Sequence, residues 1–273
     1  MRRFALVVFL LAAASLHAQT PHWSTSGCNG DQGNTQDNSW GWFHQERVCE
    51  MRRTELPIIS GQLNVKGTNG GIEVIGEDHN NISLEARVTA HASSKDEAEQ
   101  IERQVKIITD GTIHDEGPRP SGWFSRNGYS VDYRLHVPRH LSAELHTENG
   151  GIEIKHVEGV LRAETTNGGL TLKGLAGDVH ARTVNGGVQV ELTGEGWHGA
   201  GLSARSINGG ISVTAPDHYS AHLVAKTVNG GISIDFPETV QGSFKNQLDT
   251  NLGQGGPTIH LETVNGGVSI SRK

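Results

Sequence analysis

The chain has 273 residues and contains 36 glycines, while only 5% of its residues are aromatic and 34% are hydrophobic. This composition favours many short strands and tight turns over one large globular core. The formal net charge is −7, so the sequence argues against binding to nucleic acid or to an anionic membrane surface.

Residues 1–18 have the pattern of a bacterial secretory signal. Arg2 and Arg3 precede an apolar run at residues 4–16, and Ala18 supplies the small residue expected before a cleavage site. The apolar run is shorter than the ~20 residues that cross a bilayer. We therefore expect a periplasmic or secreted protein, cleaved near Ala18, with no direct membrane insertion after cleavage.

The next segment, residues 19–55, is expected to be a polar leader that carries both cysteines. In an exported chain an isolated pair such as Cys28 and Cys49 favours a disulfide bond. The alternative is a reactive thiol or metal pair, but no nearby ligand cluster supports it. The leader also contains three tryptophans, which we expect to cover the first coil rather than to form a sticky patch: Trp23, Trp40 and Trp42.

Residues 56–144 are expected to form a first repeat followed by a helix-containing half. Apolar and polar residues alternate around Leu63 and Ile72, as in half-buried strands. The period changes at residues 94–108, where Ser93 or Ser94 can accept hydrogen bonds from the start of a helix. Apolar residues then fall on one helical face through Ile108. The sequence therefore predicts one α-helix near 94–108.

One motif, Thr-x-Asn-Gly-Gly followed by apolar-x-apolar, organises the rest of the chain, residues 145–273. Its asparagines are Asn69, Asn149, Asn167, Asn185, Asn208, Asn229 and Asn265. A repeat of about 18–21 residues is the mark of stacked coils. We therefore predict an all-β, right-handed β-solenoid or β-helix-like stack of two-stranded coils. The last interval between asparagines is about twice the others, which predicts a coil without its motif within residues 243–261.

The residue types of the motif suit a sharp reversal of the chain. Asparagine tolerates a left-handed backbone, and glycine adopts positive φ or lets neighbouring coils approach closely. Stacking would place Asn over Asn and Thr over Thr, so that their side chains could hydrogen-bond along the stack. We interpret the seven asparagines as structural turn residues rather than as a binding code.

Together these residues resemble a known bacterial family. The resemblance rests on Val-Asp-Tyr-Arg-Leu-His-Val-Pro at 131–138, on Gly177-Asp178-Val179 and on the recurring motif. The family consists of exported repeated-strand proteins labelled "putative adhesin" or domain of unknown function, and it is similar to GIN head domains. The resemblance implies a right-handed β-solenoid-like fold in the bacterial envelope, and it carries no catalytic residues.

The chemistry-bearing residues do not form a recognisable catalytic pattern. Glu73 and Glu153 would come close if their coils stack, but a solvated face explains them equally well. His146, His156 and His180 could form a weak metal site between coils, although solvated histidines are the favoured interpretation. We therefore predict no enzyme activity, no catalytic residue, no cofactor and no metal site.

An apolar stripe is the one unexpected feature of the repeats. The residue before the motif asparagine becomes apolar in the later copies: Val184, Ile207, Val228 and Val264. If these side chains point outward they form a possible partner surface. The favoured interpretation is that the turn tucks them inward or that a loop at residues 241–257 covers them.

These observations lead to a functional expectation. We expect a non-catalytic exported envelope protein that acts as a binding or scaffold module of the adhesin-like kind. The alternatives are a β-helical carbohydrate-active enzyme and an accessory protein in envelope-stress signalling. The partner would be an envelope protein or a glycan, not nucleic acid, and the sequence leaves the oligomeric state open.

Overall fold

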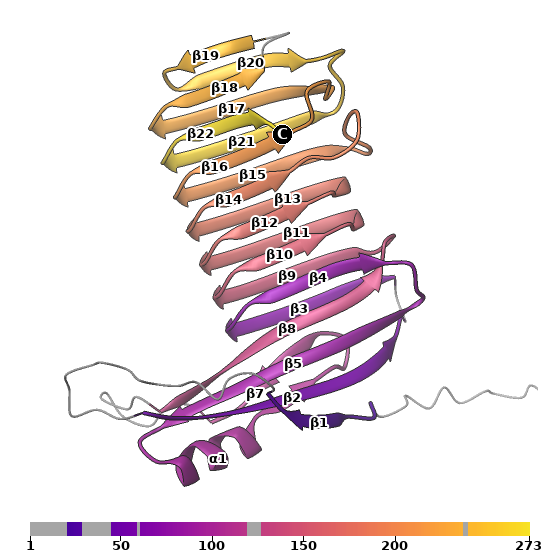
Figure 1. Cartoon of the computed structure of the whole chain (residues 1–273), viewed down its shortest axis with the longest axis vertical. Helices are drawn as coiled ribbons and strands as arrows, with labels where there is room; N and C mark the ends of the chain where they lie inside the picture. The colour runs from indigo at the N-terminus through magenta and orange to yellow at the C-terminus, as the bar shows by residue number, and fades with distance from the viewer. Residues whose placement is uncertain (1–20, 29–44, 59–60, 119–126, 237–239) are drawn as a thin grey trace, which may run out of the picture.

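Two stacked β-sheets dominate the computed structural model, which describes residues 21–28, 45–58, 61–118, 127–236 and 240–273. The sheets have twelve and ten strands, and the described ranges also contain one helix (Figure 1). The prediction of an all-β stack of coils with one helix is therefore confirmed. The predicted signal segment, Trp40 and Trp42 lie outside the described residues. None of the helices in the described ranges is long and apolar enough to span a membrane.

Long antiparallel strands form one end of the twelve-stranded sheet: β1 (Ser24–Gly27), β2 (Glu46–Pro57), β5 (Asn81–Ala92) and β8 (Gly128–Pro138). Alternate residues of β5, such as Leu84 and Val88, are fully buried. Strand β2 lies inside the segment that we predicted to be a polar leader. That prediction is wrong for residues 46–55, because Val48, Thr54 and Leu56 supply a strand with an inward face.

Helix α1 (Lys95–Gln104) packs against this end of the sheet. The Ser94 hydroxyl accepts a hydrogen bond from the Glu97 amide at 3.3 Å, so the predicted start of the helix holds. The helix ends earlier than predicted. Arg52 donates hydrogen bonds to the backbone carbonyls of Glu102 and Val105, and the chain then becomes strand β6 (Lys106–Ile108). Strand β6 pairs with β7 (Ile113–Glu116) at the edge of the ten-stranded sheet.

Each coil of the stack has one strand in the ten-stranded sheet, an Asn-Gly-Gly corner and one strand in the twelve-stranded sheet. Equivalent strands of neighbouring coils pair in parallel and in register. The coils are β3 (Gln62–Asn69) with β4 (Ile72–Glu77), β9 (Ser142–Asn149) with β10 (Ile152–Lys155), β11 (Glu158–Asn167) with β12 (Leu170–Lys173), β13 (Ala176–Asn185) with β14 (Val188–Glu191), β15 (Gly201–Asn208) with β16 (Ile211–Ala215), β17 (Ala221–Asn229) with β18 (Ile232–Phe236), and β21 (Thr258–Asn265) with β22 (Val268–Arg272).

The core lies between the two sheets. In the β9/β10 coil, Ile152 and Ile154 point inward from the twelve-stranded sheet, and Ala143 and Leu145 point inward from the ten-stranded sheet. Their polar neighbours face solvent, as the alternation in the sequence predicts. The core is therefore a continuous column of apolar side chains, one layer per coil.

The corners lie one above another. The side-chain amide of each motif asparagine except Asn69 donates to the side-chain oxygen of the preceding asparagine in the stack, at 2.8–3.0 Å. We call this row the asparagine ladder; its order along the stack is Asn69, Asn149, Asn167, Asn185, Asn208, Asn265 and Asn229. The motif hydroxyls do not bond to one another as predicted. They are buried, and each donates to a glycine carbonyl of the neighbouring coil, as Thr165 does to Gly150 at 2.8 Å.

Of the two reasons expected for glycine at the corner, close approach of neighbouring coils is confirmed at the first glycine. No motif asparagine has positive φ, so the prediction of a left-handed asparagine is wrong. Among the glycines that follow them, only Gly70 and Gly209 have positive φ. The first glycine is required by close approach: a Cβ on Gly168 would lie 1.9 Å from the Gly150 carbonyl oxygen. Side chains are excluded because adjacent corners touch through their backbones.

The C-terminal coils do not follow sequence order. Strands β21 and β22 lie between β15/β16 and β17/β18. The predicted motif-less coil within residues 243–261 is absent from the described residues there. Instead β19 (Val240–Phe244) and β20 (Gln247–Leu252) pair antiparallel to β18 and β17. These two strands cover the end of the stack (Figure 1).

Candidate ligand-binding face

The outer face of the twelve-stranded sheet presents one row of side chains in register. From β2 to β18 the row reads Arg53, Glu85, Arg134, Glu73, Glu153, Thr171, Gln189, Ser212, Ser269 and Ser233. The first half of the row is charged and the second half is not. The two halves can therefore do different chemistry on one continuous surface.

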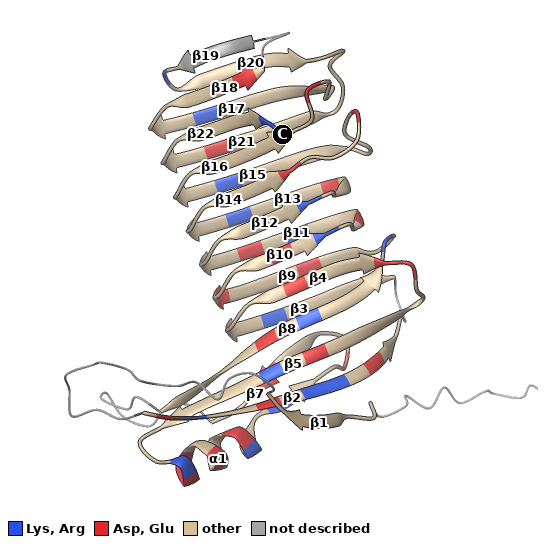
Figure 2. Ribbon diagram, viewed as in Figure 1, with Lys and Arg blue, Asp and Glu red and all other residues tan. Residues whose placement is uncertain are grey.

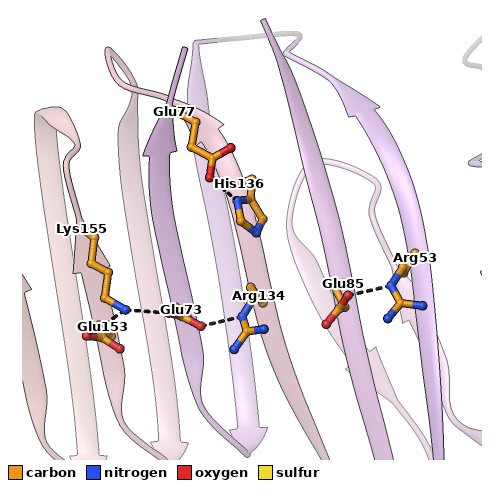
Figure 3. A network of polar contacts seen from close by, with 8 residues as sticks. All are labelled: Arg53, Glu73, Glu77, Glu85, Arg134, His136, Glu153 and Lys155. Atoms are coloured by element: carbon orange, nitrogen blue, oxygen red, sulfur yellow. Dashed lines mark hydrogen bonds and ion pairs between the residues drawn. The ribbon is translucent and has the colours of Figure 1, made fainter. Parts of the chain in front are cut away.

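Oppositely charged side chains pair in the first half and form three neighbouring groups of polar contacts, which we call the network (Figure 3). Glu73 accepts hydrogen bonds from Arg134 Nε at 2.7 Å and from Lys155 Nζ at 2.8 Å. Lys155 Nζ also lies 3.1 Å from Glu153 Oε1, and Arg53 Nε donates to Glu85 at 2.6 Å. Nearby, His136 Nδ1 lies 2.7 Å from Glu77 Oε1. The network ties together strands that are far apart in the sequence.

The network keeps Glu73 ionised. Burial raises the pKa of Glu73, but the hydrogen bonds from Lys155 and Arg134 outweigh it, and the net pKa lies below the ordinary value. The same contacts raise the pKa values of Lys155 and Arg134. Stacking does bring Glu73 beside Glu153, as the sequence suggested. A glycosidase needs one carboxylic acid of raised pKa, and Glu73 is shifted in the opposite direction.

A shallow groove of about 570 Å³ crosses the uncharged half. Its floor is formed by the second glycine of four corners, and its sides include Gln189, Ser212, Ser269 and Ser233. Phe244 from β19 lines one end. None of these four polar side chains hydrogen-bonds to another described residue, and none of the groove's lining residues is charged. The groove therefore offers free amide and hydroxyl groups next to the glycine backbone and the Phe244 ring.

Sequence reasoning placed Glu73 near Glu153 but did not find the groove. Phe244 was missed because its segment was assigned to a motif-less coil, whereas it belongs to an antiparallel edge strand. The cationic partner Arg134 of Glu73 was missed because it lies in β8, a strand without the corner motif. The in-register alignment of β8, β4 and β10 was the signal that would have joined them.

The apolar stripe lies on the outer side of the other sheet, beside the asparagine ladder. Val228 is 68% exposed, and Val184, Ile207 and Val264 are half-buried. Because their neighbouring asparagines are register partners, the four residues follow one another along the stack. The favoured expectation of an inward or covered stripe is wrong for Val228, where the chain leaves an apolar side chain in solvent.

The cysteines and two of the histidines named in the sequence analysis lie in local contacts and turns. Cys28 and Cys49 form a disulfide bond with their Cα atoms 5.7 Å apart, which links the segment after β1 to β2. His180 lies 2.9 Å from Asp178, and His156 occupies a turn with φ of 55°. Among the described residues, no three His, Cys, Asp or Glu side chains are grouped so as to hold a metal ion.

Comparisons with known proteins give a family and distant structural likenesses. The family model described as Toastrack DUF4097 matches residues 54–271. A "putative cell adhesion protein" from Clostridium sporogenes is 12% identical, with 84% of this chain and 100% of that chain covered and a TM-score of 0.40. A "putative adhesin" from Bacteroides fragilis is 11% identical, with 82% and 97% covered and a TM-score of 0.37. A "putative lipid binding protein" from Parabacteroides distasonis is 12% identical, with 82% and 96% covered and a TM-score of 0.31. No curated protein matches.

Proposed function

This chain belongs to the Toastrack DUF4097 family, and we propose that it is a non-catalytic binding module of the bacterial envelope, of the adhesin-like kind. The observation that carries the proposal is the uncharged groove. Its hydroxyl and amide groups are accessible and have no partner among the described residues, while the charged half of the same face pairs its charges internally. A surface that keeps polar groups free along a rigid sheet is suited to holding a ligand.

The disulfide bond supports a location outside the reducing cytoplasm. The signal-like residues 1–18 point the same way. We propose export to the periplasm or beyond the cell. Expression with and without residues 1–18, followed by fractionation, tests this location. Retention of the full chain in the cytoplasm would contradict it.

The charge distribution supports binding rather than catalysis. The adjacent carboxylates Glu73 and Glu153 share the ammonium group of Lys155, and the lowered pKa of Glu73 does not suit a proton donor. The groove itself brings no titratable side chain to a bound ligand. We propose that the ligand is neutral, either an uncharged glycan or an uncharged stretch of an envelope protein, because a charged ligand would lose its hydration without gaining a counter-charge.

A panel of neutral and charged polysaccharides, together with envelope extracts, tests the proposal. We expect retention of a neutral ligand without new reducing or unsaturated ends. Ser212→Glu and Ser233→Glu should each weaken retention about tenfold or more, since a buried unpaired charge costs well over 1.4 kcal/mol. Ser203→Glu, on the outer side of the other sheet, is the matched control. Turnover that disappears in Glu73→Gln would replace the proposal with an enzyme.

The exposed end of the apolar stripe favours a second contact, with a partner protein. Val228→Lys should leave folding intact, because the side chain is 68% exposed, and should weaken the partner interaction. Leu223→Lys, on the same strand but fully buried, is the control that should unfold the protein. If Val228→Lys captures the envelope partner as well as the unaltered chain does, the apolar stripe is not the partner-binding surface.

A further inference from the structure

The coil formed by β21 and β22, residues 258–272, sits between two coils that precede it in the sequence. Strand β21 pairs in parallel with β15 on one side and with β17 on the other. Strand β22 likewise lies between β16 and β18. We call residues 258–272 the inserted coil, and the space between the β15/β16 and β17/β18 coils the insertion slot.

Both walls of the insertion slot bind the inserted coil through backbone and buried side chains. The Gly209 amide donates to the Asn265 carbonyl, and the Gly266 amide donates to the Asn229 carbonyl, both at 3.0 Å. The Thr263 hydroxyl donates to the Gly209 carbonyl at 2.7 Å. Ile259 is fully buried in the core. The slot thus recognises an extended segment with an Asn-Gly-Gly corner and alternate apolar residues.

Opposite charges line the junction between the inserted coil and both walls of the insertion slot. At the third position before the motif asparagine, Glu262 lies between its register partners Arg205 and Lys226. Arg205 Nε is 3.2 Å from Glu262 Oε2. Figure 2 shows this acidic band of β21 between the basic bands of β15 and β17. If the slot closed, the repeat would place Arg205 beside Lys226, and like charges directly opposite each other are destabilising.

The inserted coil is joined to the preceding strand by a short, glycine-rich connection, residues 253–257. Gly253, Gly255 and Gly256 all have positive φ. Glycine-rich connections behave as flexible chains, so this one can extend as well as fold back. The only two cysteines of the chain are bonded to each other at the opposite end of the molecule. The inserted coil is therefore held in the slot by non-covalent contacts alone.

We infer that the insertion slot accepts a β-coil supplied by another molecule, and that its occupant is the inserted coil of a second copy of this chain. The second copy supplies the same corner, the same apolar pair and the same glutamate that the slot recognises. Reciprocal exchange of an identical segment gives a closed two-fold dimer without any new interface in the stack. This inference is independent of the ligand proposed for the groove.

Two conservative substitutions report the exchange in full-length protein. Ser212 and Ser269 are exposed register partners on the wall and on the inserted coil. The Ser212→Cys and Ser269→Cys chains are mixed, unfolded in urea at acidic pH to suppress thiol exchange, refolded together at high concentration and oxidised. The control mixture is Ser212→Cys with Ser233→Cys, two residues that the inserted coil separates. Exposed Ser→Cys changes leave the fold intact, which near-ultraviolet circular dichroism verifies.

We expect disulfide-linked dimers from the first mixture, increasing with protein concentration, and only background from the control. Equal dimer yields from the two mixtures, or a yield that does not depend on concentration, would overturn the inference.

Discussion

The coils from β9 to β14 and the coils from β15 to β22 use the same corner, yet only the first group stacks in sequence order. In both groups the asparagine ladder and the hydroxyl-to-glycine hydrogen bonds continue without interruption. The corner therefore determines the register of each coil but not its neighbour. The neighbour of each coil must be set by residues outside the motif, and Glu262, between Arg205 and Lys226, is the one tested below.

The largest expected effect comes from filling a corner in the regular group. Gly168→Ala would place a Cβ 1.9 Å from the Gly150 carbonyl oxygen, so the coils must separate. We expect a loss of about 3 kcal/mol in the free energy of unfolding. Gly169→Ala is the matched control, because its Cβ would meet its nearest atom at 3.4 Å. Urea unfolding of both variants measures the difference, and similar losses would show that close approach does not explain the first glycine.

The next largest loss of stability is expected from removing asparagines of the asparagine ladder. A substitution in the middle of the ladder is compared with one at its end. Asn167 donates to Asn149 and accepts from Asn185, whereas Asn229 makes a single ladder bond, to Asn265. At about 1 kcal/mol per hydrogen bond, Asn167→Ala should cost about 2 kcal/mol and Asn229→Ala about 1 kcal/mol. Thermal or urea unfolding checks the ratio. A larger loss at Asn229 would mean that the ladder does not end there.

Charge at the inserted coil should give a smaller, salt-dependent effect. Glu262→Lys faces two cations and should lower the free energy of unfolding by about 1 kcal/mol at low ionic strength. Added salt should reduce the loss, since the side chains are partly exposed. Glu262→Gln, which removes charge without reversing it, should lose about half as much on the same grounds. A loss from Glu262→Lys that salt does not change would point to packing instead.

The smallest expected effect is on the acid dependence of stability, which should change in the charged half of the outer face and not in the uncharged half. Because the pKa of Glu73 is lowered from 4.5, its stabilising contribution is present above pH 4.5 and is lost as the pH falls below that value. Glu73→Gln should flatten this acid loss, by less than about 1 kcal/mol for so exposed a network. Ser212→Ala, in the uncharged half, should leave the acid part of the stability curve unchanged. An unchanged curve in Glu73→Gln would place the acid sensitivity elsewhere.

Much of the stack was predictable from the sequence, because the corner motif and the alternation of apolar residues are local signals. Ser94 likewise marked the start of α1. The order of the coils was not predictable from the motif, because every copy offers the same register. Sequence order would have placed Arg205 beside Lys226, but the stack already places Arg182 beside Arg205, so this repulsion alone did not reveal the order. The groove depended on β19, whose antiparallel pairing is set by the end of the stack and not by any repeat.

The most direct test of the account is the neighbour of β16. Full-length Ser212→Cys/Ser269→Cys and Ser212→Cys/Ser233→Cys are refolded at low concentration and oxidised, and the disulfides are mapped. Adjacent parallel strands lie about 4.8 Å apart, within the Cα separation a disulfide allows, and strands two apart lie beyond it. The inserted coil predicts an intramolecular disulfide between residues 212 and 269 and none between 212 and 233. The reverse result would show that the coils stack in sequence order and would contradict the account.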